Sequence, residues 1–238
     1  MISFLFLGFL IGMSHALEAD HLAAVGAMAA QKRGGKRALV WRGISWGVGH
    51  TITLFALCFL VLIFGVAMTD ERAAMLEFGV GAMLVLLGLD VLRRMRAKRV
   101  HFHVHDHGDG RPHLHAHSHE GAPTGHDRDP HQHTHAGFSL KALGVGLIHG
   151  AAGSAALLAL AVAATTDAMT ALAYVLVFGV GSVAGMGLLS FVAAWPLQGV
   201  ERHAQTFYRA LTVLAGGFAI FLGAKIMLST GDLAWRAI

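Results

Sequence analysis

Long apolar runs separated by short polar connections organise the whole chain. A helix needs about 20 predominantly apolar residues to cross the hydrocarbon core of a bilayer, which is roughly 30 Å thick. Six segments meet this requirement: residues 2–30, 38–66, 73–92, 139–164, 171–195 and 206–229. The pattern therefore predicts an all-α fold, that of a polytopic membrane protein with six transmembrane helices.

The composition agrees with a membrane protein. Hydrophobic residues make up 55% of the chain and charged residues 13%, and the mean hydropathy is +0.60. Soluble domains usually carry about 25% charged residues. The single cysteine, Cys58, excludes an intrachain disulfide and a cysteine metal cluster, and we expect it to be a small buried residue. The apolar N-terminus lacks a basic region and a small-residue cleavage site, which indicates a retained first helix rather than a signal peptide.

The distribution of charge predicts an orientation in the membrane. Connections 31–37, 93–99 and 196–205 carry Lys or Arg, whereas 67–72 is mildly acidic and 165–170 has no basic residue. Basic loops of membrane proteins stay in the cytoplasm. We therefore expect a multi-pass protein of the cell's plasma (inner) membrane with loops 31–37, 93–137 and 196–205 in the cytoplasm and both termini outside it. The formal charge of +4 then indicates contact with membrane lipid and no nucleic-acid partner.

Residues 93–137 form a connection of a different kind. Twelve of the 17 histidines of the chain lie there, mostly in H-x-H alternation. The segment has no apolar face able to form a core, so we expect a disordered cytoplasmic loop that buffers divalent metal ions, with an inert linker as the alternative. The histidines expected to bind metal are His101, His103, His105, His107, His113, His115, His117, His119, His131, His133 and His135.

The two ends of the chain share short patterns in the same order. Gly12-Met-Ser-His15 resembles Gly146-Leu-Ile-His149, and Trp46-Gly-Val-Gly-His50 resembles Phe178-Gly-Val-Gly-Ser182. Gly81 and Gly88 have the same spacing as Gly216 and Gly223. Three spans per half is an odd number, so the halves would have opposite orientations in the bilayer, as in many transporters that rock one repeat against the other. We predict two inverted three-helix repeats, 1–92 and 138–238, joined by the loop 93–137.

Four ionisable residues interrupt the first apolar segment within seven positions: His15, Glu18, Asp20 and His21. An ionisable group at the bilayer centre costs about 2.5–3.5 kcal/mol on insertion scales, so these side chains must face protein, water or an ion. On a regular helix of about 100° per residue, His15, Glu18 and His21 share one arc of about 120°, and Asp20 lies off it. A break in the helix would let Asp20 turn inward, and the sequence leaves both arrangements open.

The residue types in this cluster are typical metal ligands. Imidazole and carboxylate without thiolate suit Ni²⁺, Co²⁺ or Zn²⁺. The alternative to a metal site is a hydrogen-bonded network that ties the helices together. His50 and His149 join the set because they occupy related positions in the two repeats. The predicted metal ligands are His15, Glu18, Asp20, His21, His50 and His149. Ser154 and Ser182 are weaker candidates for supporting hydrogen bonds, and we expect Asp90 and Lys225 to be interfacial.

Two motifs resemble the nickel/cobalt transporter family. His-Ala-Leu-Glu-Ala-Asp-His, residues 15–21, fits the family signature H-x-x-x-x-D-H, and Gly49-His50-Thr51 resembles its L-G-H-[ST] element. The resemblance implies metal recognition by His15, Asp20, His21 and His50. Glu18 stands where the family usually has aspartate. Better-known importers of the family have eight spans, so this chain is more similar to the shorter, urease-accessory-type permeases, and its His-rich loop resembles that of related efflux proteins.

We therefore expect a transporter rather than an enzyme, with Ni²⁺ or Co²⁺ as substrate and no permanent cofactor. Import is favoured because the two motifs are nearer to the importer pattern, and efflux is the alternative because of the His-rich loop. An intramembrane metalloenzyme is disfavoured by the lack of an H-E-x-x-H motif, and a metal sensor or storage protein by the inverted repeat. A cytoplasmic metallochaperone is a candidate partner. The chain has no P-loop motif for ATP, and no oligomeric state is predicted.

Overall fold

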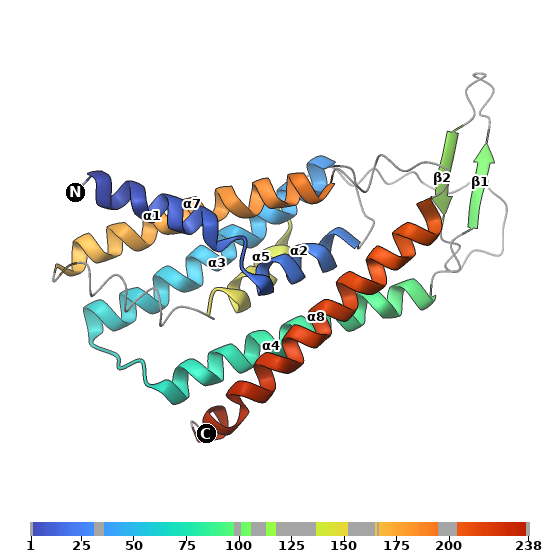
Figure 1. The fold of residues 1–238 in the computed structure, drawn as a ribbon. Helices are drawn as coiled ribbons and strands as arrows, with labels where there is room; N and C mark the ends of the chain where they lie inside the picture. The colour runs from blue at the N-terminus through green and yellow to red at the C-terminus, as the bar shows by residue number, and fades with distance from the viewer. Residues whose placement is uncertain are drawn as a thin grey trace.

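The computed structural model describes residues 2–30, 36–97, 101–105, 113–117, 137–151, 165, 167–194 and 204–236. These residues form seven helices: α1 (Ile2–His15), α2 (Ala19–Ala30), α3 (Lys36–Phe64), α4 (Asp70–Ala97), α5 (Leu140–His149), α7 (Ala168–Ala194) and α8 (Ala204–Trp235). Two short strands, β1 (His101–His105) and β2 (His113–His117), pair antiparallel beyond the end of α4 (Figure 1).

Four of the described helices are long and apolar enough to cross a membrane: Lys36–Phe64, Asp70–Arg96, Ala168–Ala194 and Arg209–Trp235. Helices α1 and α2 make a fifth candidate span, bent by 54° at their break. The prediction of a largely helical chain with several candidate membrane spans is therefore confirmed, and six spans stay a prediction. Of the predicted span 139–164, the structure describes the ten-residue helix α5 and its C-terminal turn, and residues 152–164 lie outside the described part.

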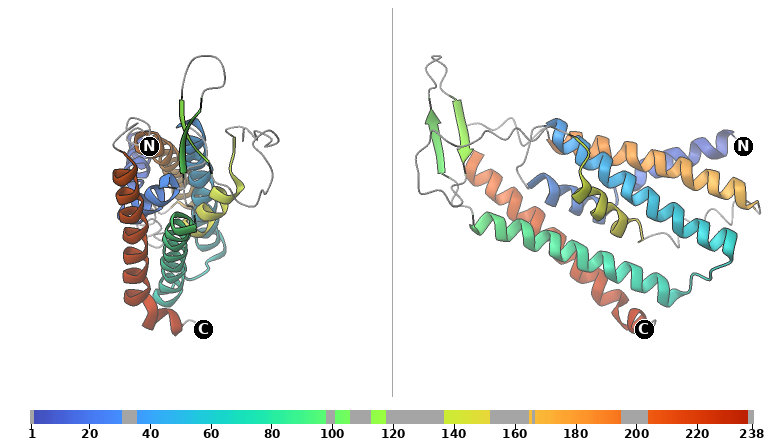
Figure 2. Two further views of the ribbon diagram at one scale, coloured as in Figure 1. Left: turned by 90° about the vertical axis from the view of Figure 1, so that its right-hand side faces the viewer. Right: turned by 180° about the vertical axis from the view of Figure 1, so that it is seen from behind.

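The helices form two groups, each drawn from both halves of the chain. In the first group α3 packs against α5 and α7, and α1 packs against α7. In the second, α4 and α8 lie along each other and make the most extensive helix–helix contact of the described chain (Figures 1 and 2). Helix α2 lies between the groups, with its main contacts on α8 and smaller ones on α4 and α7. The two ends of the broken span therefore pack in different groups.

The first span breaks at the polar cluster. The backbone N–H groups of Leu17 and Glu18 donate to the carbonyls of Ser14 and His15, which are tight three-residue turns rather than α-helical bonds. The next α-helical bond runs from the N–H of Leu22 to the carbonyl of Glu18 and starts α2. The break directs the C-terminal end of one half-helix and the N-terminal end of the other toward the interior.

Glycine allows the shortest backbone contacts of the first group. A Cβ on Gly12 would overlap the carbonyl oxygen of Phe178, and a Cβ on Gly146 would overlap that of Trp46. Helix α1 therefore touches α7, and α5 touches α3, backbone to backbone. Association of this kind is driven by close packing, because lipid tails are as apolar as the helices.

The structure differs from the sequence-based expectation of disorder in part of the segment 93–137. Helix α4 continues to Ala97, and β1 and β2 pair with His101 opposite His117, His103 opposite His115 and His105 opposite His113. The physical reason is the H-x-H alternation itself, because a period of two with Phe102, Val104 and Leu114 in between is typical of a strand. Residues 98–100, 106–112 and 118–136 lie outside the described chain.

Both termini lie at the end of the molecule away from the hairpin (Figures 1 and 2). The C-terminal end of α3 and the N-terminal end of α4 lie at this same end of the molecule. This arrangement agrees with two termini on one side of a membrane and the loop 93–137 on the other. Which side is cytoplasmic stays a prediction from the charge distribution.

The contact of Gly146 gives a test with a control on the same helix. Alanine is better than glycine in a helix by roughly 1 kcal/mol, so Gly144→Ala, which meets nothing within 4 Å, should be neutral or stabilising. Gly146→Ala should instead lower the free energy of unfolding by about 1–3 kcal/mol, because its Cβ meets the backbone of Trp46. Thermal unfolding in detergent measures both. Equal stability of the two variants would contradict the backbone contact of α5 with α3.

Candidate metal centre

Polar side chains from four helices meet at the break in the first span. His15 is the last residue of α1, and Asp20 and His21 lie in the first turn of α2. His50 lies in the middle of α3, and His149 is the last residue of α5. The three side chains of His21, His50 and His149 are at most 1% exposed. The structure thus brings together five of the six predicted ligands, from positions up to 134 residues apart (149 − 15).

Asp20 joins α2 to α5. Its Oδ1 accepts hydrogen bonds from Nδ1 of His21 at 2.9 Å and from the backbone N–H of His21 at 2.9 Å, and its Oδ2 accepts from Nε2 of His149 at 3.0 Å. An ionised carboxylate has only acceptor oxygens, so both imidazole nitrogens must donate. The bonds therefore fix the tautomers, and the lone pairs remain on Nε2 of His21 and Nδ1 of His149.

Glu18 supports His15 from outside the cluster. Nδ1 of His15 donates to Oε1 of Glu18 at 2.7 Å, and the Glu18 side chain is 58% exposed. The bond leaves the lone pair of His15 on Nε2, in the manner by which carboxylates orient metal-ligating histidines. Of the two arrangements that the sequence left open, the structure has the broken helix, with Asp20 turned inward and Glu18 outward.

Several buried imidazole nitrogens have no hydrogen-bond partner among the described residues: Nε2 of His15, Nε2 of His21, both ring nitrogens of His50 and Nδ1 of His149. The indole Nε1 of Trp46 is likewise buried and has no partner there. Buried polar atoms are nearly always satisfied by protein, ordered water or an ion. Leaving one bare costs about 1–3 kcal/mol, and here five lie in one cluster. One of the two His50 nitrogens carries a proton in the neutral ring, so the five nitrogens offer four lone pairs, and such a set is suited to a cation.

Two overlapping sets of ligand atoms have metal-binding dimensions. One is His15, His21 and His50, and the other is Asp20, His21 and His149, with the ligand atoms of each set all within 4.8 Å of one another. Nitrogen ligands about 2.1 Å from a common ion lie at most about 4.2 Å apart, so small side-chain movements would close either set on an ion. Helices α1 and α5 both end at the cluster, and the partial negative charge of their C-termini favours a cation there.

Two aromatic residues that the sequence analysis did not single out as site residues form the walls. The Trp46 side chain is fully buried, with its ring centroid 5.3 Å from that of His21 and 5.4 Å from that of His149. Phe178 lies 5.3 Å from His15. The sequence held two signals for them. Trp46 and Phe178 occupy the same place in the repeated pattern, and Trp46 is four residues before His50 and therefore on the same helix face.

The remaining polar candidates do not belong to the two sets of ligand atoms or lie outside the described chain. Ser182 is buried, and its hydroxyl has no partner among the described residues. Asp90 accepts from Nε of Arg94 at 2.8 Å and lies 3.7 Å from Nζ of Lys141, and Lys225 is exposed within the candidate span Arg209–Trp235. The interfacial positions of Asp90 and Lys225 stay a prediction. Ser154 and the loop positions His107, His119, His131, His133 and His135 lie outside the described residues.

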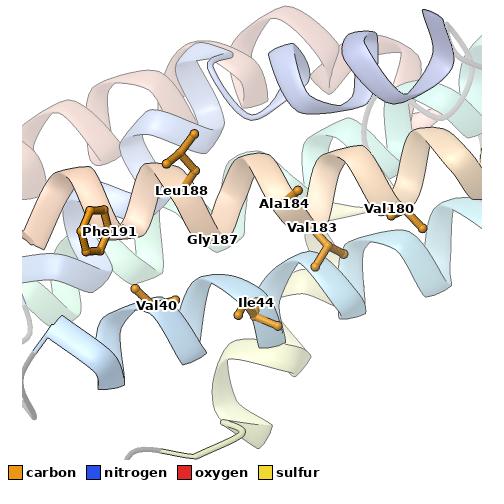
Figure 3. Close-up of a pocket in the computed structure, with 8 residues that line it drawn as sticks. All are labelled: Val40, Ile44, Val180, Val183, Ala184, Gly187, Leu188 and Phe191. Carbon is orange, nitrogen blue, oxygen red and sulfur yellow. The ribbon is translucent and has the colours of Figure 1, made fainter. Parts of the chain in front are cut away.

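An apolar groove of about 570 Å³ runs between α3 and α7, and none of the clustered histidines lines it (Figure 3). Its lining consists of Val40, Ile44, Val180, Val183, Ala184, Gly187, Leu188 and Phe191. These side chains offer no nitrogen or oxygen ligand. The groove is therefore chemically suited to hydrocarbon.

The apolar helices, the broken span and the buried cluster are those of a helical membrane protein with a buried histidine/carboxylate cluster at the break of a candidate span. Urease accessory protein UreH from Bacillus sp. (strain TB-90) is 34% identical to this chain over 201 residues, which cover 80% of the chain and 75% of that relative. No family model and no solved structure matches. The chain belongs to the nickel/cobalt transporter-type family of UreH, and this relationship also supports the prediction that it is not an enzyme.

The bond between Asp20 and His149 should hold α2 and α5 together even without metal. Asp20→Asn and His149→Gln should each lower the free energy of unfolding by about 1–3 kcal/mol, because each leaves a buried partner unsatisfied. The double variant should lose less than the sum, with a coupling of about 0.5–3 kcal/mol, measured by thermal unfolding in the presence of a chelator. Ser14→Ala, an exposed change on α1, should combine additively with either variant. Additivity of the Asp20 and His149 changes would contradict the bond.

Proposed function

We propose that this protein transports Ni²⁺ or Co²⁺ across a membrane through the buried histidine/carboxylate cluster. The observation that carries the proposal is the convergence of His15, His21, His50 and His149 around Asp20 at the break in an apolar span, with five ring nitrogens lacking partners among the described residues. The family relationship to UreH supports nickel/cobalt-related membrane transport as the class. The choice between the two ions is part of the proposal.

The donor set suits an ion that must be bound and then released. Neutral imidazoles lose no proton on binding near neutral pH, and a nitrogen-rich set without thiolate binds borderline divalent ions less tightly than a cysteine site. Transport requires coordination that is strong enough to replace the hydration shell and weak enough for release. A single carboxylate among four imidazoles would offset part of the charge of the ion and leave it exchangeable.

Reciprocal contacts support the proposal of two inverted repeats. The contact of Gly12 with Phe178 corresponds to that of Gly146 with Trp46, because the repeat relates Gly12 to Gly146 and Trp46 to Phe178. The same exchange relates the contact of Gly181 with Phe9 to that of Gly49 with Leu143, and the contact of Gly81 with Gly223 to that of Gly88 with Gly216. Contacts that recur when the two halves are exchanged are expected from a two-fold axis between repeats. The proposed architecture is therefore six spans, with the centre near the axis.

Import is the direction we propose, with efflux as the alternative. The motifs at residues 15–21 and 49–51 are nearer to the importer pattern, and the proposed orientation puts the hairpin and its histidines in the cytoplasm. An ion released from the centre on that side would meet the loop first. In this arrangement the loop would hold the ion before a cytoplasmic acceptor such as a metallochaperone takes it.

Flux of labelled Ni²⁺ into vesicles that contain the purified protein tests the function. The wild type should give flux above protein-free vesicles, and the His15→Ala/His21→Ala double variant should lose at least 90% of it, because both sets of ligands are then broken. Ser14→Ala is the control on the same span and should keep wild-type flux. Equal flux by the wild type and the double variant would count against the site.

The His-rich loop should modulate transport without being part of the pathway. The register of β1 and β2 places three pairs of histidines opposite each other, and directly opposed residues have Cβ atoms about 4.5–5.5 Å apart, a separation that suits two ligands of one ion. Deletion of residues 101–135 should weaken total metal binding and change the concentration dependence of flux, while flux itself remains. Complete loss of flux in a folded deletion variant, measured in the same vesicles, would place the loop in the pathway.

A further inference from the structure

We propose that the cluster provides two overlapping ion positions that share His21, and that a transported ion occupies them one after the other. The inference rests on the proposed transport function and deepens it. The first position is formed by His15, His21 and His50, and the second by Asp20, His21 and His149. A single cage of all five residues is the alternative.

The ring of His21 lies between the two positions. Its centroid is 4.4 Å from that of His15 on one side and 4.4 Å from that of His149 on the other, whereas the rings of His50 and His149 are 6.0 Å apart. Among the described residues, the ligand atoms that lie within 4.8 Å of one another fall into two sets, and neither set contains both His50 and His149. The geometry therefore favours two sites with a common ligand over one central site.

The chemistry of His21 makes the two positions mutually exclusive. A neutral imidazole has one lone-pair nitrogen and one N–H. While Nδ1 of His21 donates to Asp20, its Nε2 is available to the first position. An ion in the second position would replace the hydrogen bonds that Asp20 accepts from the rings of His21 and His149. The proton of each ring would then reside on the opposite nitrogen, so the number of bound protons is unchanged. Nε2 of His21 would carry a proton in that state and could not bind an ion in the first position. Two divalent ions this close would also repel each other strongly in a low-dielectric interior.

Each position has one partly exposed ligand of its own. The His15 side chain is 12% exposed in the first position, and the Asp20 side chain is 21% exposed in the second, whereas His50 and His149 are fully buried. The first position uses α1, α2 and α3, and the second uses α2 and α5. The second half of the chain therefore contributes a ligand only to the second position. An ion that moves from the first position to the second exchanges ligands of the first half alone for ligands of both halves.

Trp46 provides a local reporter of both positions, which is needed because the histidines of the loop are also expected to bind metal. Its ring is within 5.4 Å of those of His21 and His149, and Ni²⁺ and Co²⁺ quench indole fluorescence at short range. The full-length chain with Trp41, Trp195 and Trp235 changed to Phe keeps Trp46 as its single tryptophan. In this background His50→Gln breaks the first position, His149→Gln breaks the second, and Ser14→Ala is the control.

Two positions predict that each single variant still binds. Titration with Ni²⁺ should show quenching weakened by less than tenfold in His50→Gln and in His149→Gln, and by more than a hundredfold in the double variant. Both single variants should nevertheless lose more than 90% of vesicle flux, because one of the two ion positions on the transport pathway is broken. The corresponding Ala variants repeat the comparison with side chains that cannot bind metal, and size-exclusion profiles confirm that each variant is folded.

A single cage predicts a different result. Each single variant would then lose as much affinity as the double variant, and this outcome would overturn the two positions while leaving the transport function in place. Absence of quenching in the wild type by both ions would overturn the transport function, and the two positions with it. Wild-type flux in the His149→Gln variant would show that the second position is not on the pathway and would also overturn the inference.

Discussion

The Asp20 carboxylate is the charge around which the interior of this protein is arranged. A carboxylate within apolar helices is tolerated only when other groups meet its charge, and Asp20 accepts bonds from two imidazoles on different helices. These bonds set the tautomers of His21 and His149 and hold α2 against α5. The remaining ring nitrogens then have lone pairs but no partners among the described residues, so the same interaction that stabilises the cluster also prepares it for a cation.

Much of the centre was readable from residue types and spacing. His15, Asp20 and His21 stood out because ionisable residues in an apolar segment carry an energetic cost that a binding partner must offset. His50 and His149 stood out because they lie at related places in the two halves. The function of Glu18 was harder to read. Its position on the helical arc of His15 and His21 assumed a regular helix, and the break at residues 16–18 moved Glu18 outward and Asp20 inward.

Other features depended on contacts that no local pattern reveals. The break in the first span has neither proline nor a glycine pair to announce it, and the walls formed by Trp46 and Phe178 follow from the packing of α1, α3, α5 and α7. The hairpin had a visible period of two, but the high polarity of the segment outweighed that signal in the sequence analysis. Long apolar helices were predictable because bilayer thickness sets their length directly.

The packing of the helices bears on which parts of the molecule can move. The extensive contacts join α1 to α7, α3 to both α5 and α7, and α4 to α8, so every one of them connects the first half of the chain with the second. A rotation of one half as a rigid body would break all of these contacts at once. A shift of the α4–α8 pair relative to α1, α3, α5 and α7 would keep these extensive contacts. Because α2 packs mainly on α8, it would move with that pair and shift Asp20 and His21 along the histidines of α1, α3 and α5.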